Sequence, residues 1–206
     1  MQGITHRHFY FFLLFVPFFI TSCATTGSRY SQYRLPGSID YASYDPQTFT
    51  SRLPQQISMG REKVVVVDPS SHAWGAYNPD GTLLRGGVAT AGGDSCEGEV
   101  GSCRTATGTF RIGARQGETC YSKKYPKPYG GGLMPYCQFF HGGQALHGSP
   151  DNIVVDNNIS HGCVRMRIQD AEWLYSNFAT TGTKVVVLPY NKPYSAPNPD
   201  DQTKAL

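Results

Sequence analysis

Residues 63–90 read KVVVVDPSSHAWGAYNPDGTLLRGGVAT, and this stretch decides the class of the fold. The β-branched run at its start is typical of a buried strand, and residues 73–77 suit a second strand. The letters NPDG at 78–81 predict a tight turn, because proline fixes φ and glycine accepts a positive φ. Residues 82–90 then form the returning strand, so the segment predicts antiparallel β-structure.

The rest of the domain extends this pattern. Residues 107–112, 144–147 and 184–188 are predicted to be further short strands. The chain has 206 residues with 23 Gly, 14 Pro and 16% charged residues, which is typical of a domain with many turns. We predict a mostly β domain over residues 61–190, with one or two short helices. The main helix is expected over residues 170–178, with one apolar face made by Ala171, Leu174, Tyr175 and Phe178.

The N-terminus has the features of an export signal over residues 1–22. Residues 9–20 are apolar apart from one proline, and a stretch of this length is too short for a membrane span, which needs roughly 20 residues. The letters ITSC at 20–23 resemble the bacterial lipobox, in which the chain is cut before the cysteine and Cys23 receives a diacylglycerol. The alternative is an ordinary secretory signal that is cleaved nearby. Both interpretations place the domain outside the cytoplasm.

Two polar segments flank the domain. Residues 23–60 are predicted to be a lipid-anchored tether, with the alternative that its second half lies on the domain. Residues 191–206 are predicted to be a disordered tail. We expect the protein at the periplasmic face of a bacterial membrane. Ala24 favours the outer membrane, because an aspartate there is the usual signal for retention in the inner membrane of Gram-negative bacteria.

The charge balance gives no indication of a nucleic-acid partner. The chain has 18 Lys plus Arg and 15 Asp plus Glu, a formal charge of +3. Proteins that bind nucleic acids by neutralising phosphates concentrate their basic residues in a patch or run. No such run is present in the sequence, so we expect no nucleic-acid binding.

Two short motifs carry the residues most capable of chemistry, ALHGS at 145–149 and SHGCVRM at 160–166. A cysteine becomes a competent nucleophile when a neighbouring base takes its proton. His147 and His161 are both near Cys163 in the sequence, and the first motif borders a predicted strand. Gly162 has no side chain, so a substrate carbonyl could approach backbone N–H groups that stabilise an oxyanion. The pattern predicts a Cys/His site for acyl transfer.

Other interpretations of these residues stay open. Zinc would need four ligands, with His141 as the fourth beside His147, His161 and Cys163. Cys163 could also be a buried thiol or half of a disulfide. The chain has six cysteines, however, and lipidation of Cys23 leaves an odd number, so one thiol must stay unpaired. For the remaining four, Cys96, Cys103, Cys120 and Cys137, we favour sequential disulfide pairing over a zinc site, and we expect no metal and no cofactor.

The two motifs resemble the signature of the L,D-transpeptidase (YkuD) catalytic domain, which cross-links bacterial peptidoglycan. The letters TATGTF at 105–110, GLMPY at 132–136 and DAEWLY at 170–175 are also similar to that family. Ala106 departs from the family's Thr-Pro-Thr-Gly segment, where proline is usual. The resemblance covers about residues 63–189 and implies a β-sandwich or barrel-like fold.

The resemblance also implies roles for individual residues. Cys163 would be the nucleophile and His147 its general base, oriented by the backbone carbonyl of Gly148. His161 would line the site and help to hold the acyl group, and the amides of Gly162 and Cys163 would form the oxyanion hole. Arg165 could shape the loop, which we favour, or meet a substrate carboxylate. The residues expected at the substrate-binding surface are Ser160, Gly162, Arg165, Met134 and Tyr136.

The implied reaction cleaves the bond between the third residue of a peptidoglycan stem and its terminal D-Ala, through a thioester on Cys163. The acceptor could be the amine of a second stem, a lysine of a wall-anchored lipoprotein, or water, which would make the protein an L,D-carboxypeptidase. A non-catalytic wall-binding module is a further alternative, against which the presence of both His147 and Cys163 argues. NlpC/P60-like hydrolases place the cysteine before the histidine, whereas here the histidine comes first.

Overall fold

The computed structural model of the protein describes residues 34–96, 98–126 and 128–191. The predicted signal peptide, the lipid site at Cys23, the first part of the tether and the tail from residue 192 lie outside the described residues. Within the described part of the chain, no helix is both long enough and apolar enough to span a membrane.

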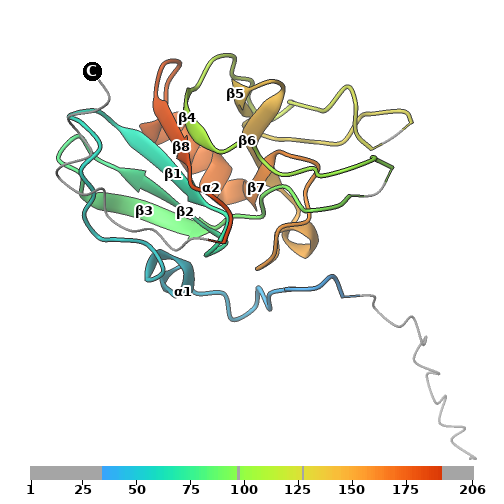
Figure 1. The fold of residues 1–206 in the computed structure, drawn as a ribbon, viewed down its shortest axis with the longest axis horizontal. Helices are drawn as coiled ribbons and strands as arrows, with labels where there is room; N and C mark the ends of the chain where they lie inside the picture. The colour runs from blue at the N-terminus through green and yellow to red at the C-terminus, as the bar shows by residue number, and fades with distance from the viewer. Residues whose placement is uncertain (1–33, 97, 127, 192–206) are drawn as a thin grey trace, which may run out of the picture. The chain divides into compact units, whose positions relative to one another are not determined.

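The larger sheet contains five strands in the order β3-β2-β1-β8-β4 (Figure 1). β1, β2 and β3 follow one another in antiparallel register, while β8 lies parallel to β1 and antiparallel to β4. The predicted turn at 78–81 is confirmed, since the Gly81 N–H donates to Asn78 O at 2.8 Å and Gly81 has a φ of +86°. The strands are Val64–Asp68 (β1), Ala73–Tyr77 (β2), Leu83–Val88 (β3), Gly108–Arg111 (β4) and Lys184–Val187 (β8).

The smaller sheet contains three strands in the order β5-β6-β7, with β6 antiparallel to β5 and parallel to β7. These strands are Gln138–His141 (β5), Gln144–Ser149 (β6) and Val164–Arg167 (β7). The sequence predicted only β6 among them. β5 and β7 have only four residues each and lie next to glycine-containing turns. An alternation of apolar and polar residues is hard to recognise over so short a segment.

The helical segments are short. α1 is Gln47–Thr50, η1 is the 3₁₀ turn Asp151–Ile153, α2 is Ile168–Trp173, and η2 is the π-helical turn Leu174–Phe178 that continues α2. The predicted helix at 170–178 is therefore present but starts two residues earlier. Three of its four predicted apolar residues are buried, namely Ala171, Leu174 and Phe178.

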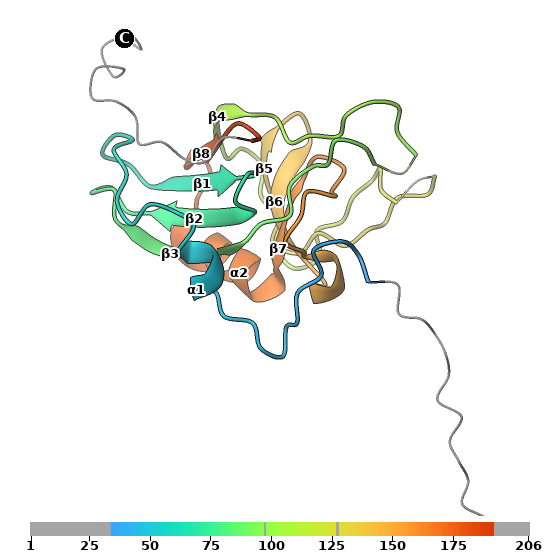
Figure 2. The same cartoon turned by 60° about the horizontal axis from the view of Figure 1, so that its bottom comes forward.

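One hydrophobic core joins the two sheets and α2 (Figure 2). Val65 and Val67 of β1 and Val185 and Val187 of β8 contribute from the larger sheet. Side chains of the smaller sheet and of α2 complete the core: Leu146, Val164, Met166, Ala171 and Leu174. A shared core of this kind fixes the smaller sheet, which carries both sequence motifs, against the larger one. The mostly β prediction is confirmed.

The N-terminal segment from residue 34 covers the other face of the larger sheet. Val64 and Val66 point away from the shared core and pack in a separate cluster with Ile57. Phe49 and Leu53 are 3% and 4% exposed and pack in another cluster. The unbroken valine run of β1 reflects burial on both faces of the strand. The second half of the predicted tether thus lies on the domain, which is the alternative that the sequence left open.

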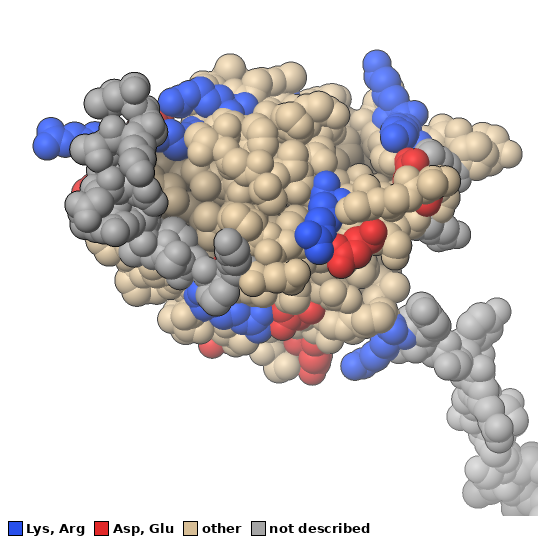
Figure 3. Space-filling model, viewed as in Figure 1, with Lys and Arg blue, Asp and Glu red and all other residues tan. Residues whose placement is uncertain are grey.

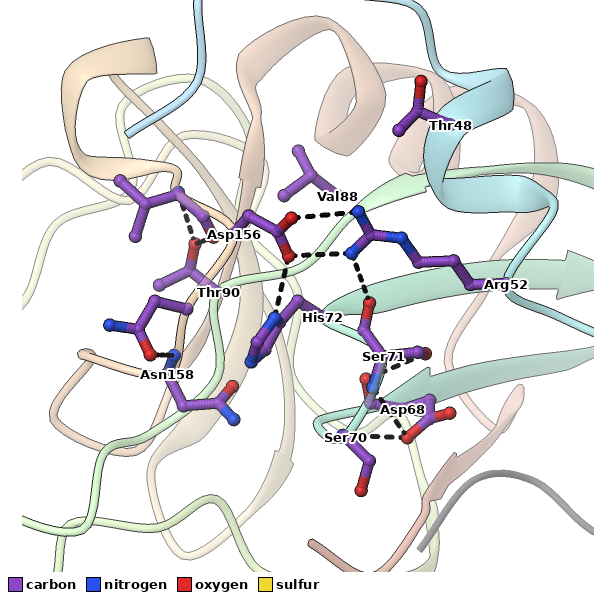
Figure 4. A network of polar contacts seen from close by, with 12 residues as sticks. Thr48, Arg52, Asp68, Ser70, Ser71, His72, Val88, Thr90, Asp156 and Asn158 are labelled. Atoms are coloured by element: carbon purple, nitrogen blue, oxygen red, sulfur yellow. Dashed lines mark hydrogen bonds and ion pairs between the residues drawn. The ribbon is translucent and has the colours of Figure 1, made fainter. Parts of the chain in front are cut away.

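A polar network anchors the connection between β6 and β7 (Figure 4). The Asp156 carboxylate accepts hydrogen bonds from Arg52 Nη1 and Nη2 at 2.7 and 2.9 Å and lies 2.8 Å from His72 Nδ1. The Thr90 hydroxyl donates to Val155 O and accepts from Val155 N–H, both at 2.7 Å. These contacts tie the residues that lead into the second motif to the N-terminal segment and the larger sheet.

Asp156 makes this network sensitive to acid. Partial burial acts to raise the pKa of Asp156, but the hydrogen bonds from His72 and Arg52 outweigh burial and hold the pKa well below its usual range. A carboxyl group whose pKa is lower in the folded than in the unfolded protein stabilises the fold at pH values above its unfolded pKa, which is about 4. This stabilisation decreases as the pH falls from there towards the folded pKa.

We therefore expect Asp156→Asn to lower the free energy of unfolding at pH 7 by about 1–2 kcal/mol, the usual range for a hydrogen-bonded charge that is partly exposed. Urea unfolding of both proteins between pH 7 and 3 would test this, and the difference should shrink as the pH falls below about 4. Glu118→Gln, at an exposed carboxylate, is the matched control. A difference that is the same at pH 7 and pH 3 would contradict the explanation.

Candidate active site

The pairing of β6 with β7 brings the two motifs into one pocket. His147 lies within β6 opposite Arg165 of β7, and Cys163 immediately precedes β7. The Cys163 Sγ lies 3.9 Å from Gly143 O, just before the start of β6. Cys163, His147, His161 and Arg165 all line a single cavity of about 820 Å³. The structure thus brings four of the predicted site residues into one pocket.

Residues 90–93 hold the second motif from the side opposite β6. Thr90 and Arg165 exchange two backbone hydrogen bonds, of 3.0 and 2.9 Å. The Ser160 N–H donates to Ala91 O and the Gly93 N–H donates to Ser160 O, both at 3.0 Å. The motif therefore has backbone partners on both sides, which fixes its position. This pairing could not be predicted from the sequence, because residues 90–93, which come shortly after β3, have no regular apolar period.

His147 has a defined tautomer. Its Nδ1 lies 2.8 Å from Gly148 O, and a carbonyl oxygen can only accept, so Nδ1 carries the hydrogen and Nε2 keeps its lone pair. Burial lowers the pKa of His147 to about 4, an effect to which the charge of Arg165 adds and which the bond to Gly148 opposes. His147 is thus a neutral base at pH 7. A Cβ at Gly148 would lie 3.0 Å from Ile168 Cα, so a larger residue there would require its neighbours to shift by a few tenths of an ångström.

Cys163 is the unpaired cysteine among the described residues. Burial raises the pKa of the Cys163 thiol, against smaller opposite effects of a hydrogen bond from the Ala145 backbone and of the charge of Arg165. The resting site therefore holds a neutral thiol and a neutral imidazole.

The turn that carries Cys163 is held by Ser160. The Ser160 hydroxyl donates to Cys163 O and accepts a hydrogen bond from the Gly162 N–H at 3.1 Å. Gly162 has a φ of +113°, which favours glycine. The Gly162 amide was expected to help form an oxyanion hole, but its hydrogen is already donated to Ser160. In this conformation the Cys163 amide is the better candidate for that role.

Two disulfide-closed loops meet at the pocket. Cys96 pairs with Cys103 and Cys120 with Cys137, each with Cα atoms 6.1 Å apart, so the favoured sequential pairing is confirmed.

Residues of the second loop line the cavity, among them Tyr121, Tyr125 and Met134. The Tyr125 ring lies 4.5 Å from the His161 ring, and its hydroxyl donates to Glu99 of the first loop. Tyr125 is a pocket residue that the sequence motifs did not identify.

Some predicted residues lie elsewhere. Met134 lines the pocket, but Tyr136, which was expected at the substrate-binding surface, does not. Tyr136 has a φ of +60° and its ring packs against Tyr175, 5.8 Å away, at the edge of the shared core. The left-handed backbone turns the side chain from the pocket. His141, required by the zinc alternative, lies outside the pocket with its ring 4.8 Å from that of Phe110.

Three of the described Lys and Arg side chains line the pocket, namely Lys123, Lys124 and Arg165, and Lys124 pairs with Glu99. Arg165 lines the pocket, and no described carboxylate forms an ion pair with it. Within the described ranges, no group of three or more His, Cys, Asp or Glu is arranged to hold a metal ion. On the face shown in Figure 3, basic side chains lie in separate places, several beside acidic ones, so that face carries no continuous basic surface.

Comparison with known proteins agrees with this geometry. The two-sheet β domain carries a free cysteine and a buried histidine in one pocket. Residues 62–187 match the family model YkuD, the L,D-transpeptidase catalytic domain. The chain therefore belongs to the L,D-transpeptidase catalytic-domain family. A comparison with curated proteins gave no match.

Solved structures support the same assignment. An L,D-transpeptidase from Xylanimonas cellulosilytica is 25% identical with a TM-score of 0.54, over 64% of this chain and 63% of that one. One from Mycobacterium smegmatis is 25% identical with a TM-score of 0.51, over 62% and 59%. A third, solved in complex with imipenem, shares the fold at 22% identity with a TM-score of 0.52, over 61% and 58%. The chain thus spans less than two thirds of each of these structures.

The protonation state of the site leads to a prediction about thiol reactivity. Because burial raises the pKa of Cys163, its alkylation by iodoacetamide should keep accelerating as the pH rises beyond about 8.5, the usual thiol pKa. Mass spectrometry of the peptide that contains Cys163 would follow the reaction, with Cys163→Ser to verify the site. A rate that is already constant between pH 5 and 7 would indicate a thiolate–imidazolium pair and contradict this description.

Proposed function

We propose that the protein is a peptidoglycan L,D-transpeptidase that uses Cys163 as its nucleophile. The observation that carries the proposal is the arrangement of a free thiol and a neutral histidine in one pocket, with Nδ1 of His147 bound to Gly148 O at 2.8 Å. This leaves Nε2 as the proton acceptor. The family of the chain supports the substrate class, the stem peptides of peptidoglycan.

In the first step, Cys163 Sγ attacks the carbonyl between the third stem residue and D-Ala. A carbon–sulfur bond forms, and the thiol proton passes to Nε2 of His147. The amide C–N bond then breaks, and His147 gives this proton to the departing amine of D-Ala. A histidine with a pKa of about 4 holds the proton only briefly, which favours its donation to the leaving group.

In the second step, an amine attacks the thioester, its proton passes through His147 to the sulfur, and the free thiol is restored. A stem amine as acceptor gives a 3→3 cross-link, and a lysine of a wall-anchored lipoprotein gives attachment to the wall. Water as acceptor would give L,D-carboxypeptidase activity at the same site. A cavity of about 820 Å³ is of the size that holds a short peptide.

Arg165 supports a substrate that carries a carboxylate. Its guanidinium lines the pocket, and burial lowers its pKa, so the charge is incompletely solvated. A carboxylate of the stem peptide would compensate for this burial by forming charge-assisted hydrogen bonds. We therefore propose that Arg165 contacts the substrate, in place of the purely structural role favoured from the sequence.

We also propose that the protein is exported and attached to a membrane by a lipid on Cys23. The two disulfides support an oxidising compartment. With those four cysteines paired and Cys163 free, Cys23 is the remaining cysteine of the six in the chain. The choice of the outer membrane is part of this proposal and rests on Ala24.

The reaction can be tested with purified disaccharide-tetrapeptide and mass spectrometry of the products. We expect loss of D-Ala with formation of dimers, no turnover by Cys163→Ala, and a loss of about 10²- to 10⁴-fold in kcat/KM for His147→Ala. His141→Ala is the matched control, because His141 lies outside the pocket, and it should retain the wild-type rate. Turnover by Cys163→Ala would refute the mechanism, and tripeptide as the main product would favour the carboxypeptidase.

Lipid attachment can be tested separately in cells. Cys23→Ser should move the protein from the membrane fraction to the soluble fraction of a bacterial host, because the lipid would be its anchor. The alternative of an ordinary secretory signal predicts soluble protein for both the wild type and the variant. Membrane association of the variant would refute attachment at Cys23.

A further inference from the structure

Thr105 lies behind the turn that carries Cys163 and contacts it directly. Its side chain is buried, with 1% of its surface exposed, and Thr105 Oγ1 donates a hydrogen bond to Gly162 O at 2.9 Å. The same hydroxyl accepts a hydrogen bond from the Gly92 N–H, also at 2.9 Å. A hydroxyl has one hydrogen, and a carbonyl can only accept, so this arrangement directs that hydrogen to Gly162 O.

The Gly162 carbonyl determines the direction of the Cys163 amide. A peptide unit is planar and trans, so its C=O and the following N–H point in opposite directions. Glycine alone gives little restraint, because its backbone has more accessible conformations than that of other residues. The bond from Thr105 to Gly162 O, with the bond from the Gly162 N–H to Ser160 at 3.1 Å, supplies the missing restraint.

Tyr190 completes this support from the C-terminal end of the described chain. Its hydroxyl donates to Gly92 O at 2.8 Å and accepts from the Thr105 N–H at 2.9 Å. Tyr190, Gly92 and Thr105 therefore form a closed ring of hydrogen bonds. The Tyr190 ring is held in turn by the Arg104 guanidinium, 4.5 Å from its centroid, and Arg104 pairs with Asp94.

We infer that Thr105 and Tyr190 are positioning residues, which hold the Gly162–Cys163 peptide so that the Cys163 N–H faces the oxyanion formed during acyl transfer. This inference rests on the proposed function. Tyr190 lies beyond residues 62–187, which match the family model, so this part of the support comes from a segment outside the matched domain. Neither residue lines the pocket, so neither is expected to contact the substrate.

The test compares two reactions of the same sulfur in the full chain. Acylation by a carbapenem passes through an oxyanion, whereas alkylation by iodoacetamide does not. We expect Thr105→Val to slow acylation of Cys163 by about 10- to 100-fold, as for a misplaced or lost oxyanion donor. Alkylation should stay within about twofold of wild type, because it needs only the thiolate. Thr105→Ser, which keeps the hydroxyl, should restore acylation, and Tyr190→Phe should reduce it less than Thr105→Val does.

Matched controls separate positioning from folding. Thr107→Val changes an exposed threonine of the same segment, and Tyr129→Phe changes an exposed tyrosine, so both should acylate like wild type. Equal slowing of acylation and alkylation in Thr105→Val, or wild-type acylation in both Thr105→Val and Tyr190→Phe, would overturn the inference alone. Failure of the wild-type protein to be acylated while it is still alkylated would overturn the proposed function and the inference with it.

Discussion

The parallel pairing of β6 with β7 is the constraint on which the site depends. This pairing places His147 opposite Arg165 and brings Cys163 to the start of β6. Parallel neighbours need a long connection, usually a helix that packs on the sheet. Here the connection over 150–163 contains only a short 3₁₀ turn, and the contacts of Asp156 and Thr90 hold it against the N-terminal segment and the segment that follows β3 (Figure 4).

Burial has two consequences for the chemistry of the pocket. It makes His147 a neutral base, and it keeps Cys163 a neutral thiol. The positive charge of Arg165 acts to lower the pKa of both groups, because it disfavours the imidazolium form of His147 and favours the thiolate form of Cys163. The Ser160 hydroxyl accepts a hydrogen bond from the Gly162 N–H, and Thr105 donates one to Gly162 O, so both side chains restrict the backbone of the turn that carries Cys163.

The sequence predicted the parts of the fold whose signals are local. The valine run, the turn at 78–81 and β6 were found where predicted, because each depends on neighbouring residues. The short strands β5 and β7 were missed, since four residues carry too little periodicity. The sequence also predicted that the two motifs come together, and His147 and Cys163 do line one pocket. It misplaced Tyr136, because the left-handed backbone of this residue cannot be inferred from its neighbours.

By itself, the sequence determined the β character of the domain, the unpaired cysteine and the residue types available for catalysis. These follow from local composition, from counting cysteines and from motif spacing. Which groups restrain that cysteine depends on how the chain folds in three dimensions. Thr105, Tyr190 and Gly92 are far from Gly162 along the chain, and their hydrogen bonds exist because β-strand pairing brings distant segments together. Likewise, the burial that sets the protonation of His147 is a property of the assembled core, since no residue can be desolvated by its sequence neighbours alone.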